Sequence, residues 1–203
     1  GRLVFTTEKQ VDIGQSLANG PLATSPMGEA YAKVAANDFS REARIGNLTP
    51  FFPTYNEPNF FTAVPVYEGN TLLGVVTLEV PSETLDNVIS NNQNWQALGL
   101  GNQGETRIVD LGSGLRLTND REFVENQTGF LGELTADGLS QSVLDSITAK
   151  NSSAGFVAND QAETNLFRLQ ESDLITADDG DLLTFKKLAV GDLSWTLVVD
   201  QDS

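Results

Sequence analysis

The feature that most restricts the fold is a pair of β-rich segments, one near the middle of the chain and one at its end. Residues 59–67 and 71–80 are runs of apolar, aromatic and β-branched side chains separated by a short Glu-Gly-Asn turn. Residues 182–190 and 193–200 repeat this pattern around a Gly-Asp turn. Two such runs joined by a short turn that contains glycine predict an antiparallel hairpin. The chain is therefore expected to build antiparallel sheet in each half.

Helical patterns and shorter strands accompany the two hairpins. One helix is predicted to begin at Ser25, which can cap it and is followed by Pro26, and to end near Asn37. Two more helices are predicted to begin at Ser82 and at Ser140. The remaining predicted strands are 2–9, 105–110, 115–118, 155–158 and 165–169. This order predicts an α+β fold in which helices cover one side of each antiparallel sheet. Because the plan occurs twice, we expect two domains, at residues 1–92 and 93–203.

Composition excludes several classes of function. The 12 basic and 28 acidic residues give a formal charge of −16, which repels phosphate backbones, so nucleic acid is not an expected partner. The chain has no cysteine and no histidine, which excludes disulfides, thiolate metal sites and Ser-His-Asp catalysis. The acidic turn at Asp178 and Asp179 lacks the spacing of an EF-hand loop, so neither a metal nor a cofactor is predicted. Carboxylate pairs of the glycosidase kind stay open, because their separation depends on the fold.

A glycine-rich segment separates the two halves. Gly99, Gly101 and Gly104 have the literal Gly-x-Gly-x-x-Gly spacing of a dinucleotide-binding loop. Here, however, a predicted helix precedes the glycines and a predicted strand follows them, which is the reverse of that motif. We therefore interpret them as a tight connection after the helix, in which Trp95 and Leu98 can pack as a plug between the two domains.

Residues 94–106, Asn-Trp-Gln-Ala-Leu-Gly-Leu-Gly-Asn-Gln-Gly-Glu-Thr, resemble a linker in double Cache sensors of bacterial cyclases and chemoreceptors. In that family a tryptophan precedes a Gly-Leu-Gly-x-x-Gly-Glu-Thr turn that opens the second domain. Other segments also resemble strands of this family and occur in the family's order. They are residues 1–6, the two runs 63–66 and 73–76 of the central hairpin, and the closing run 193–199. The resemblance touches nearly the whole chain and implies two PAS-like Cache domains. The family's long N-terminal helix and the flanking transmembrane spans are absent from this sequence.

The resemblance implies a non-catalytic, extracytoplasmic sensor in a bacterial transmembrane receptor, on the periplasmic or extracellular side of the inner membrane. Such a sensor binds a small molecule and passes a conformational change to an intracellular output. It also implies that the parent chain is anchored in the membrane, and it allows a homodimer in the full-length receptor. The alternative is a secreted or surface-attached α+β binding module without a signalling role.

Family members usually hold their ligand in the membrane-distal domain, which is the first domain here. The residues that fall on the corresponding elements are Tyr31, Phe52, Tyr55, Phe60, Thr62 and Glu79. Aromatic rings with nearby polar groups can bury and orient a small molecule, although packing in the core is the alternative for the phenylalanines and for Tyr55. Glu79 stands about where amino-acid-sensing members have an aspartate that binds the ligand's amine. Their Arg-x-Trp-Tyr segment is missing, so an α-amino acid is not the default ligand.

Overall fold

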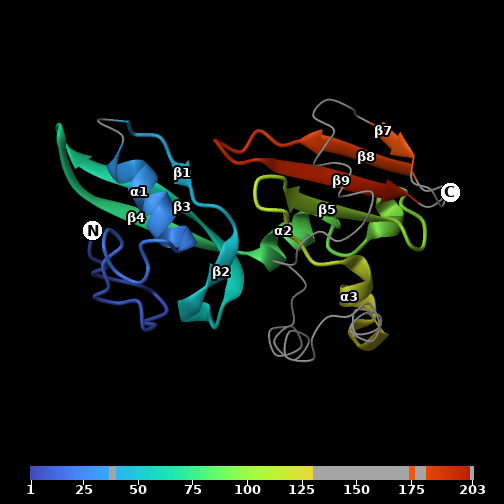
Figure 1. The fold of residues 1–203 in the computed structure, drawn as a ribbon, viewed down its shortest axis with the longest axis horizontal. Helices are drawn as coiled ribbons and strands as arrows, with labels where there is room; N and C mark the ends of the chain where they lie inside the picture. The colour runs from blue at the N-terminus through green and yellow to red at the C-terminus, as the bar shows by residue number, and fades with distance from the viewer. Residues whose placement is uncertain (37–39, 130–173, 177–181, 202–203) are drawn as a thin grey trace. The chain divides into compact units, whose positions relative to one another are not determined.

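The computed structural model describes residues 1–36, 40–129, 174–176 and 182–201 (Figure 1). Contacts divide the chain into two compact units, Gly1–Pro81 and Ser82–Ser203. The helix that begins at Ser82 therefore groups with the second unit, while the limits 1–92 and 93–203 stay a prediction for the domains. Within the described residues, no helix is long and apolar enough to cross a membrane.

In its described residues, 1–36 and 40–81, the first unit contains a four-stranded antiparallel sheet and one α-helix. Its elements are α1 (Pro26–Ala35), β1 (Arg44–Ile45), β2 (Thr49–Phe51), the 3₁₀ helix η1 (Phe52–Thr54), β3 (Glu57–Glu68) and β4 (Thr71–Pro81). The long strand β3 pairs with β4 along one edge and with both short strands, β1 and β2, along the other. The predicted central hairpin is thus confirmed, and it is the frame of this unit.

Helix α1 forms as the sequence predicts. The Oγ of Ser25 accepts a hydrogen bond of 3.2 Å from the backbone N–H of Gly28, and Pro26 occupies the first turn, where it costs no hydrogen bond. Met27, Ala30 and Val34 recur at helical spacing and are buried. This stripe packs on β3 and β4, so one face of the sheet is covered by α1 (Figure 1).

The core of the first unit lies between α1 and that sheet face. Its buried members are Leu17, Leu22, Met27, Ala30, Val34, Phe51, Phe61 and Ala63. Phe51 and Phe61 meet edge to face, with ring centroids 4.8 Å apart. Since side chains alternate along a strand, Phe60 and Thr62 point to the opposite face of β3.

The predicted strand at 2–9 is wrong. Only Arg2 forms a β-bridge, with Ser16, and the N–H of Gly14 donates to the carbonyl of Leu3 at 2.9 Å. The chain reverses at Gly14, whose φ of 81° favours glycine, so the first residues pair with the segment that follows instead of joining the sheet. Val4 is left exposed in spite of its apolar side chain.

The part of the second unit that the structure describes is built on a five-stranded antiparallel sheet of order β6-β5-β9-β8-β7 (Figure 1). Its elements are α2 (Ser82–Ile89), the 3₁₀ helix η2 (Trp95–Leu98), β5 (Glu105–Asp110), β6 (Leu115–Arg116), α3 (Arg121–Glu125), β7 (Leu174–Thr176), β8 (Leu182–Lys187) and β9 (Trp195–Gln201). The C-terminal hairpin is confirmed with a wider turn than predicted, because β8 ends at Lys187 and β9 begins at Trp195. The helix predicted at Ser140 and the strands predicted at 155–158 and 165–169 lie outside the described residues.

Both sheets are antiparallel and carry helices, so the fold class is α+β as predicted. The context of the glycine segment is also as expected, since α2 and η2 precede it and β5 follows it. Gly99 and Gly101 have positive φ values of 79° and 65°. Gly104 is required for a different reason, because a Cβ there would lie 2.4 Å from the carbonyl oxygen of Leu100 and 2.7 Å from that of Asp200. These glycines therefore serve a close backbone turn.

Candidate ligand-binding site

A cavity of about 1030 Å³ opens in the first unit, on the sheet face that carries α1. The N-terminal segment forms one wall, Met27 and Tyr31 come from α1, and Asn59 and Phe61 come from β3. Residues 72–79 and Pro81 of β4 form a further part of the lining, together with Thr54 and Glu57. A concave site of this size that mixes apolar, aromatic and a few polar groups has the usual character of a small-molecule pocket.

A short chain of hydrogen bonds organises the polar side of this cavity. The buried Asn59 donates from Nδ2 to Oγ1 of Thr54 at 3.0 Å and to Oε1 of Glu79 at 2.7 Å. The register explains the second contact: Phe61 lies opposite Glu79 and Asn59 lies opposite Pro81, so Asn59 and Glu79 are neighbours on one face. Asn59 thereby holds the carboxylate of Glu79 in one position at the cavity wall.

Four carboxylates line the cavity: Glu8, Asp12, Glu57 and Glu79. The pKa of Glu79 is raised, first because the side chain is partly buried and then because Asp12, Glu8 and Glu57 repel its charge. Among the described lining residues, Arg2 alone contributes a positively charged side chain. Acidic side chains therefore outnumber basic ones in this lining, which favours a negative potential in the cavity.

The residues predicted for the site are distributed over different faces of the first unit. Tyr31 and Glu79 line the cavity. Phe60 and Thr62 lie on the face of β3 that points away from Asn59 and Phe61. Phe52 and Tyr55 are 68% and 86% exposed, so neither is a core residue. The structure thus brings two of the six residues together at the cavity.

Sequence reasoning missed Asn59, Asp12, Glu8 and Glu57. The signal for Asn59 was the period of two along β3, which puts it on the same face as the core residues Phe61 and Ala63. The signal for the acidic residues is weaker, because Glu8 lies in the segment that was predicted as a strand and Asp12 follows that segment. Their approach to Glu79 depends on how that segment turns back.

A second cavity, of about 360 Å³, lies within the second unit among α2, Trp95, Asn119 and α3. Asp86 contributes its carboxylate to this cavity and accepts from the N–H of Asn119 at 2.7 Å and from its Nδ2 at 2.6 Å. Burial raises the pKa of Asp86 to about 6 and outweighs these hydrogen bonds, which act to lower it. This carboxyl group therefore keeps its proton to a higher pH than an ordinary aspartate does.

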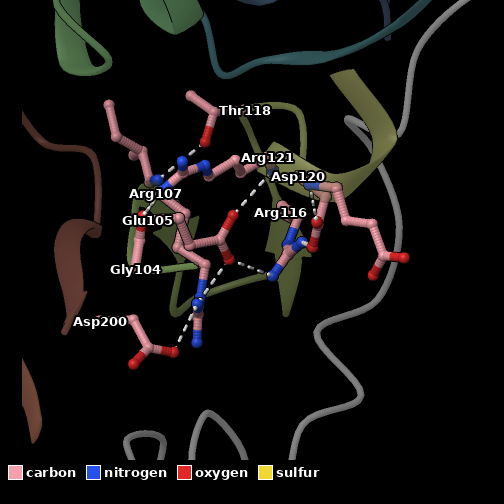
Figure 2. Close-up of polar contacts among 10 residues, drawn as sticks. Gly104, Glu105, Arg107, Arg116, Thr118, Asp120, Arg121 and Asp200 are labelled. Carbon is pink, nitrogen blue, oxygen red and sulfur yellow. Dashed lines mark hydrogen bonds and ion pairs between the residues drawn. The ribbon is translucent and has the colours of Figure 1, made fainter. Parts of the chain in front are cut away.

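A buried network of charges fixes the start of β5 in the same unit (Figure 2). The Oε1 of Glu105 accepts from Nη1 of Arg107 at 2.6 Å and lies 3.5 Å from Nη2 of Arg116, while its Oε2 accepts from the backbone N–H of Arg121 at 2.9 Å. Arg107 also donates to Oδ2 of Asp200 on β9 at 3.3 Å. Each of these charges has an oppositely charged neighbour, as buried charges require.

The side chain of Arg121 ties this network to the glycine-rich linker. Its Nη1 donates to the carbonyl oxygen of Gly104 at 2.6 Å, and its guanidinium carbon lies 4.8 Å from the centroid of the Trp95 ring. Trp95 is buried, whereas Leu98 is 44% exposed. Inside the second unit, the side chain of Arg121 thus contacts the glycine-rich linker twice, at the backbone of Gly104 and at the ring of Trp95.

No protein-family model matches the chain, and no curated protein matches it either. Among solved structures, it is similar to an extracellular ligand binding receptor from Desulfohalobium retbaense, with 10% identity and a TM-score of 0.56 over 94% of this chain and 26% of that one. The chain therefore shares the fold of part of that receptor.

Two further similar structures are ligand-binding domains of bacterial chemoreceptors. That of Pseudomonas fluorescens CtaA in complex with L-serine has 14% identity and a TM-score of 0.48, over 96% of this chain and 64% of that one. That of Pseudomonas aeruginosa PctC in complex with GABA has 12% identity and a TM-score of 0.47, over 90% and 62%. The chain spans less than two thirds of the length of all three structures.

Proposed function

We propose that this chain is the extracytoplasmic ligand-sensing part of a bacterial transmembrane receptor, and that the cavity of the first unit binds a small molecule. The observation that carries the proposal is this cavity of about 1030 Å³, with its polar group of Thr54, Asn59 and Glu79 beside the rings of Tyr31 and Phe61. The fold it occurs in is shared with an extracellular ligand binding receptor.

The arrangement favours binding over catalysis. Glu79 is held by the amide of Asn59, and the aromatic and apolar residues around it offer surface for burial but no nucleophile paired with a base. In a receptor, ligand binding changes the output only if the ligand has different affinities for two states of the protein. The two cavity walls formed by the N-terminal segment and by β4 come from distant parts of the chain, so a ligand between them can couple their positions.

A compound library screened by thermal shift and followed by isothermal titration calorimetry tests the proposal. We expect at least one small molecule to stabilise the chain, and Tyr31→Ala and Glu79→Gln to weaken its binding. Glu68→Gln is the matched control, because Glu68 is an exposed glutamate at the turn of the same hairpin and does not line the cavity. Binding that is lost in Tyr55→Ala or Thr62→Ala and kept in Glu79→Gln would contradict the choice of cavity.

The signalling role needs a separate experiment on the parent protein. Addition of the identified ligand to cells that carry the full-length receptor should change its intracellular output, and the Glu79→Gln receptor should lose this response. Binding without any change of output would instead favour a surface-attached binding module.

A further inference from the structure

The cavity of about 360 Å³ belongs entirely to the second unit and shares no lining residue with the cavity of the first unit. Its walls come from α2, the turn that follows α2, η2, β5 and α3. Small-molecule sites have volumes of roughly 300–1,000 Å³, so this cavity is near the lower end of that range. It can therefore hold only a small ligand.

Most of the polar residues that line this cavity are uncharged. Glu83 and Asp86 are the acidic ones, and among the described lining residues there is no lysine or arginine. Side-chain amides and hydroxyls offer both hydrogen-bond donors and acceptors. A ligand that carries hydroxyl groups has the same mixed character and fits such a lining. The uncharged polar lining residues are Asn87, Ser90, Gln93, Thr106, Asn119 and Gln127.

Two of these side chains keep their polar groups available for a ligand. Ser90 donates from Oγ at 2.6 Å and Thr106 from Oγ1 at 2.7 Å, each to a backbone carbonyl oxygen of α2, so their donors are used within the protein. Among the residues that the structure describes, the side-chain amides of Asn87 and Gln93 make no hydrogen bond. A ligand can therefore bind both amides without breaking a contact of the fold.

An unusual turn of the backbone presents Gln93 at the cavity wall. Asn91, Asn92 and Gln93 have φ values of 52°, 56° and 64°, a left-handed conformation that is unfavourable for residues with a Cβ. Ser90 stabilises this turn, because its Oγ accepts from the N–H of Gln93 at 2.9 Å and its carbonyl oxygen accepts from the N–H of Asn94 at 2.9 Å. Strained backbone that is held in this way is concentrated at functional sites.

The charges at this cavity disfavour ionic ligands. Both carboxylate oxygens of Asp86 already accept from Asn119, from its N–H at 2.7 Å and from its Nδ2 at 2.6 Å. Glu83 is exposed, so solvent screens its charge. An anion would meet two carboxylates and no basic side chain among the described lining residues. In the same part of the chain, no cluster of three or more acidic side chains could hold a metal ion.

Two buried aromatic residues, Trp95 and Phe123, complete the lining. The guanidinium carbon of Arg121 lies 4.8 Å from the centroid of the Trp95 ring and helps to fix the position of that ring. The carbon skeleton of a polyhydroxylated ring is apolar on its faces and can pack on aromatic surface, while its hydroxyls bind polar groups at the edge. The cavity thus combines both kinds of surface that such a ligand needs.

We propose that the second unit has a ligand site of its own, which binds a small uncharged polyhydroxylated molecule of the monosaccharide class. The amides of Asn87 and Gln93 bind its hydroxyls, and Trp95 and Phe123 contact its carbon skeleton. This site is additional to the cavity proposed for the first unit and does not depend on it.

Isothermal titration calorimetry on the 203-residue chain at pH 7 tests the inference with D-glucose, D-galactose and D-mannose. We expect at least one of these hexoses to bind, its uronate to bind roughly tenfold more weakly, and its 2-amino derivative to bind no more tightly. Asn87→Ala and Gln93→Ala should each weaken binding by roughly fivefold or more, since each removes a hydrogen bond to the ligand. Gln103→Ala is the matched control, because this exposed glutamine lines neither cavity.

Several results would overturn the inference: no binding of any of the three hexoses, equal binding of the uronate, tighter binding of the 2-amino derivative, or unchanged affinity in both alanine variants. Circular dichroism checks the folding of each variant. If an alanine variant does not fold, Asn87→Asp or Gln93→Glu replaces it with the same expectation, because each keeps the size of the side chain and removes the amide donors. Hexose binding that is lost in Tyr31→Ala and kept in Asn87→Ala would place the ligand in the first unit. The sensor function would then stand, and the second site would be wrong.

Discussion

Asn59 and Glu79, one on each strand of the β3–β4 hairpin, are joined by a hydrogen bond of 2.7 Å from Nδ2 to Oε1. The contact exists because a β-bulge between Val66 and Tyr67 shifts the pairing of the strands by one residue. Without it, continuing from the pair Tyr67 and Leu72 would place Phe60 opposite Glu79. With it, Glu79 lies opposite Phe61 and on the cavity side of the sheet.

We expect Asn59→Ala to destabilise the first unit and to weaken ligand binding. The substitution removes both hydrogen bonds of a buried amide and leaves Thr54 and Glu79 without this partner. The loss of buried hydrogen bonds of this kind costs about 1–3 kcal/mol in the free energy of unfolding. Urea unfolding measures the change, and Asn70→Ala, at an exposed asparagine in the hairpin turn, should stay within about 0.5 kcal/mol of the unsubstituted chain.

Asp86 should make the second unit less stable as the pH rises. Its pKa is about 6 in the folded chain and 3.8 when unperturbed, so the folded state holds the proton more tightly. The stabilisation of the folded state that comes from this tighter proton binding is fully present below about pH 3.8 and is lost as the pH rises through about 6. The loss is of the order of 2–3 kcal/mol at most.

Urea unfolding of Asp86→Asn and of the unsubstituted chain between pH 4 and pH 7.5 checks this sign. The stability difference should shift in favour of the asparagine variant with increasing pH. Glu83→Gln on the same helix should keep most of the dependence, since burial and not Glu83 is the largest cause of the raised pKa. If the free energy of unfolding changes with pH in the same way for Asp86→Asn and for the unsubstituted chain, Asp86 does not cause the pH dependence.

Arg121→Ala should destabilise the second unit by about 3 kcal/mol. It removes the hydrogen bond to the carbonyl oxygen of Gly104, the ion pair with Glu125 and the stacking on Trp95. Arg121→Lys keeps the charge but not the planar group, and we expect an intermediate loss. Unfolding followed by tryptophan fluorescence measures both, and Arg44→Ala, which breaks an exposed ion pair, should cost less than about 1 kcal/mol.

Two glycine-to-alanine substitutions should have different effects on the stability of the fold. At Gly104, the new Cβ meets two backbone oxygens at 2.4 and 2.7 Å, so the linker or β9 must shift and stability should fall by several kcal/mol, on the order of 2–4. At Gly74 in β4, nothing lies within 4 Å of the new Cβ. There the smaller entropy of the unfolded chain should leave stability unchanged or raise it by about 0.5 kcal/mol. Thermal unfolding compares the two variants, and equal effects would contradict the close packing assigned to Gly104.

Local patterns in the sequence predicted much of the fold. The cap at Ser25 with Pro26 determined where α1 begins, and the alternation of apolar residues around short turns determined both hairpins. These features depend on side chains close together in the sequence, so their physics can be evaluated without the fold. The strand predicted at 2–9 failed because a strand also needs an edge to pair with, and Gly14 turns this segment back on itself.

The candidate site was only partly predictable, for a related reason. Tyr31 and Glu79 were found from their elements, but whether Glu79 shares a face of the sheet with Phe60 or with Phe61 depends on a bulge that the sequence does not mark. Glu8 and Asp12 are about 70 residues from Glu79 in sequence, and their approach depends on long-range contacts.

The sequence by itself determined the α+β class, the antiparallel hairpins and the glycine-rich connection at 99–104, because each follows from local conformational preference. Tertiary structure alone decided which carboxylates share one cavity and that Asp12 is buried there with an unpaired oxygen. It also decided that Arg107, Arg116 and Arg121 gather around Glu105. Electrostatic interactions depend on distance and burial, and both are set only when remote segments pack together.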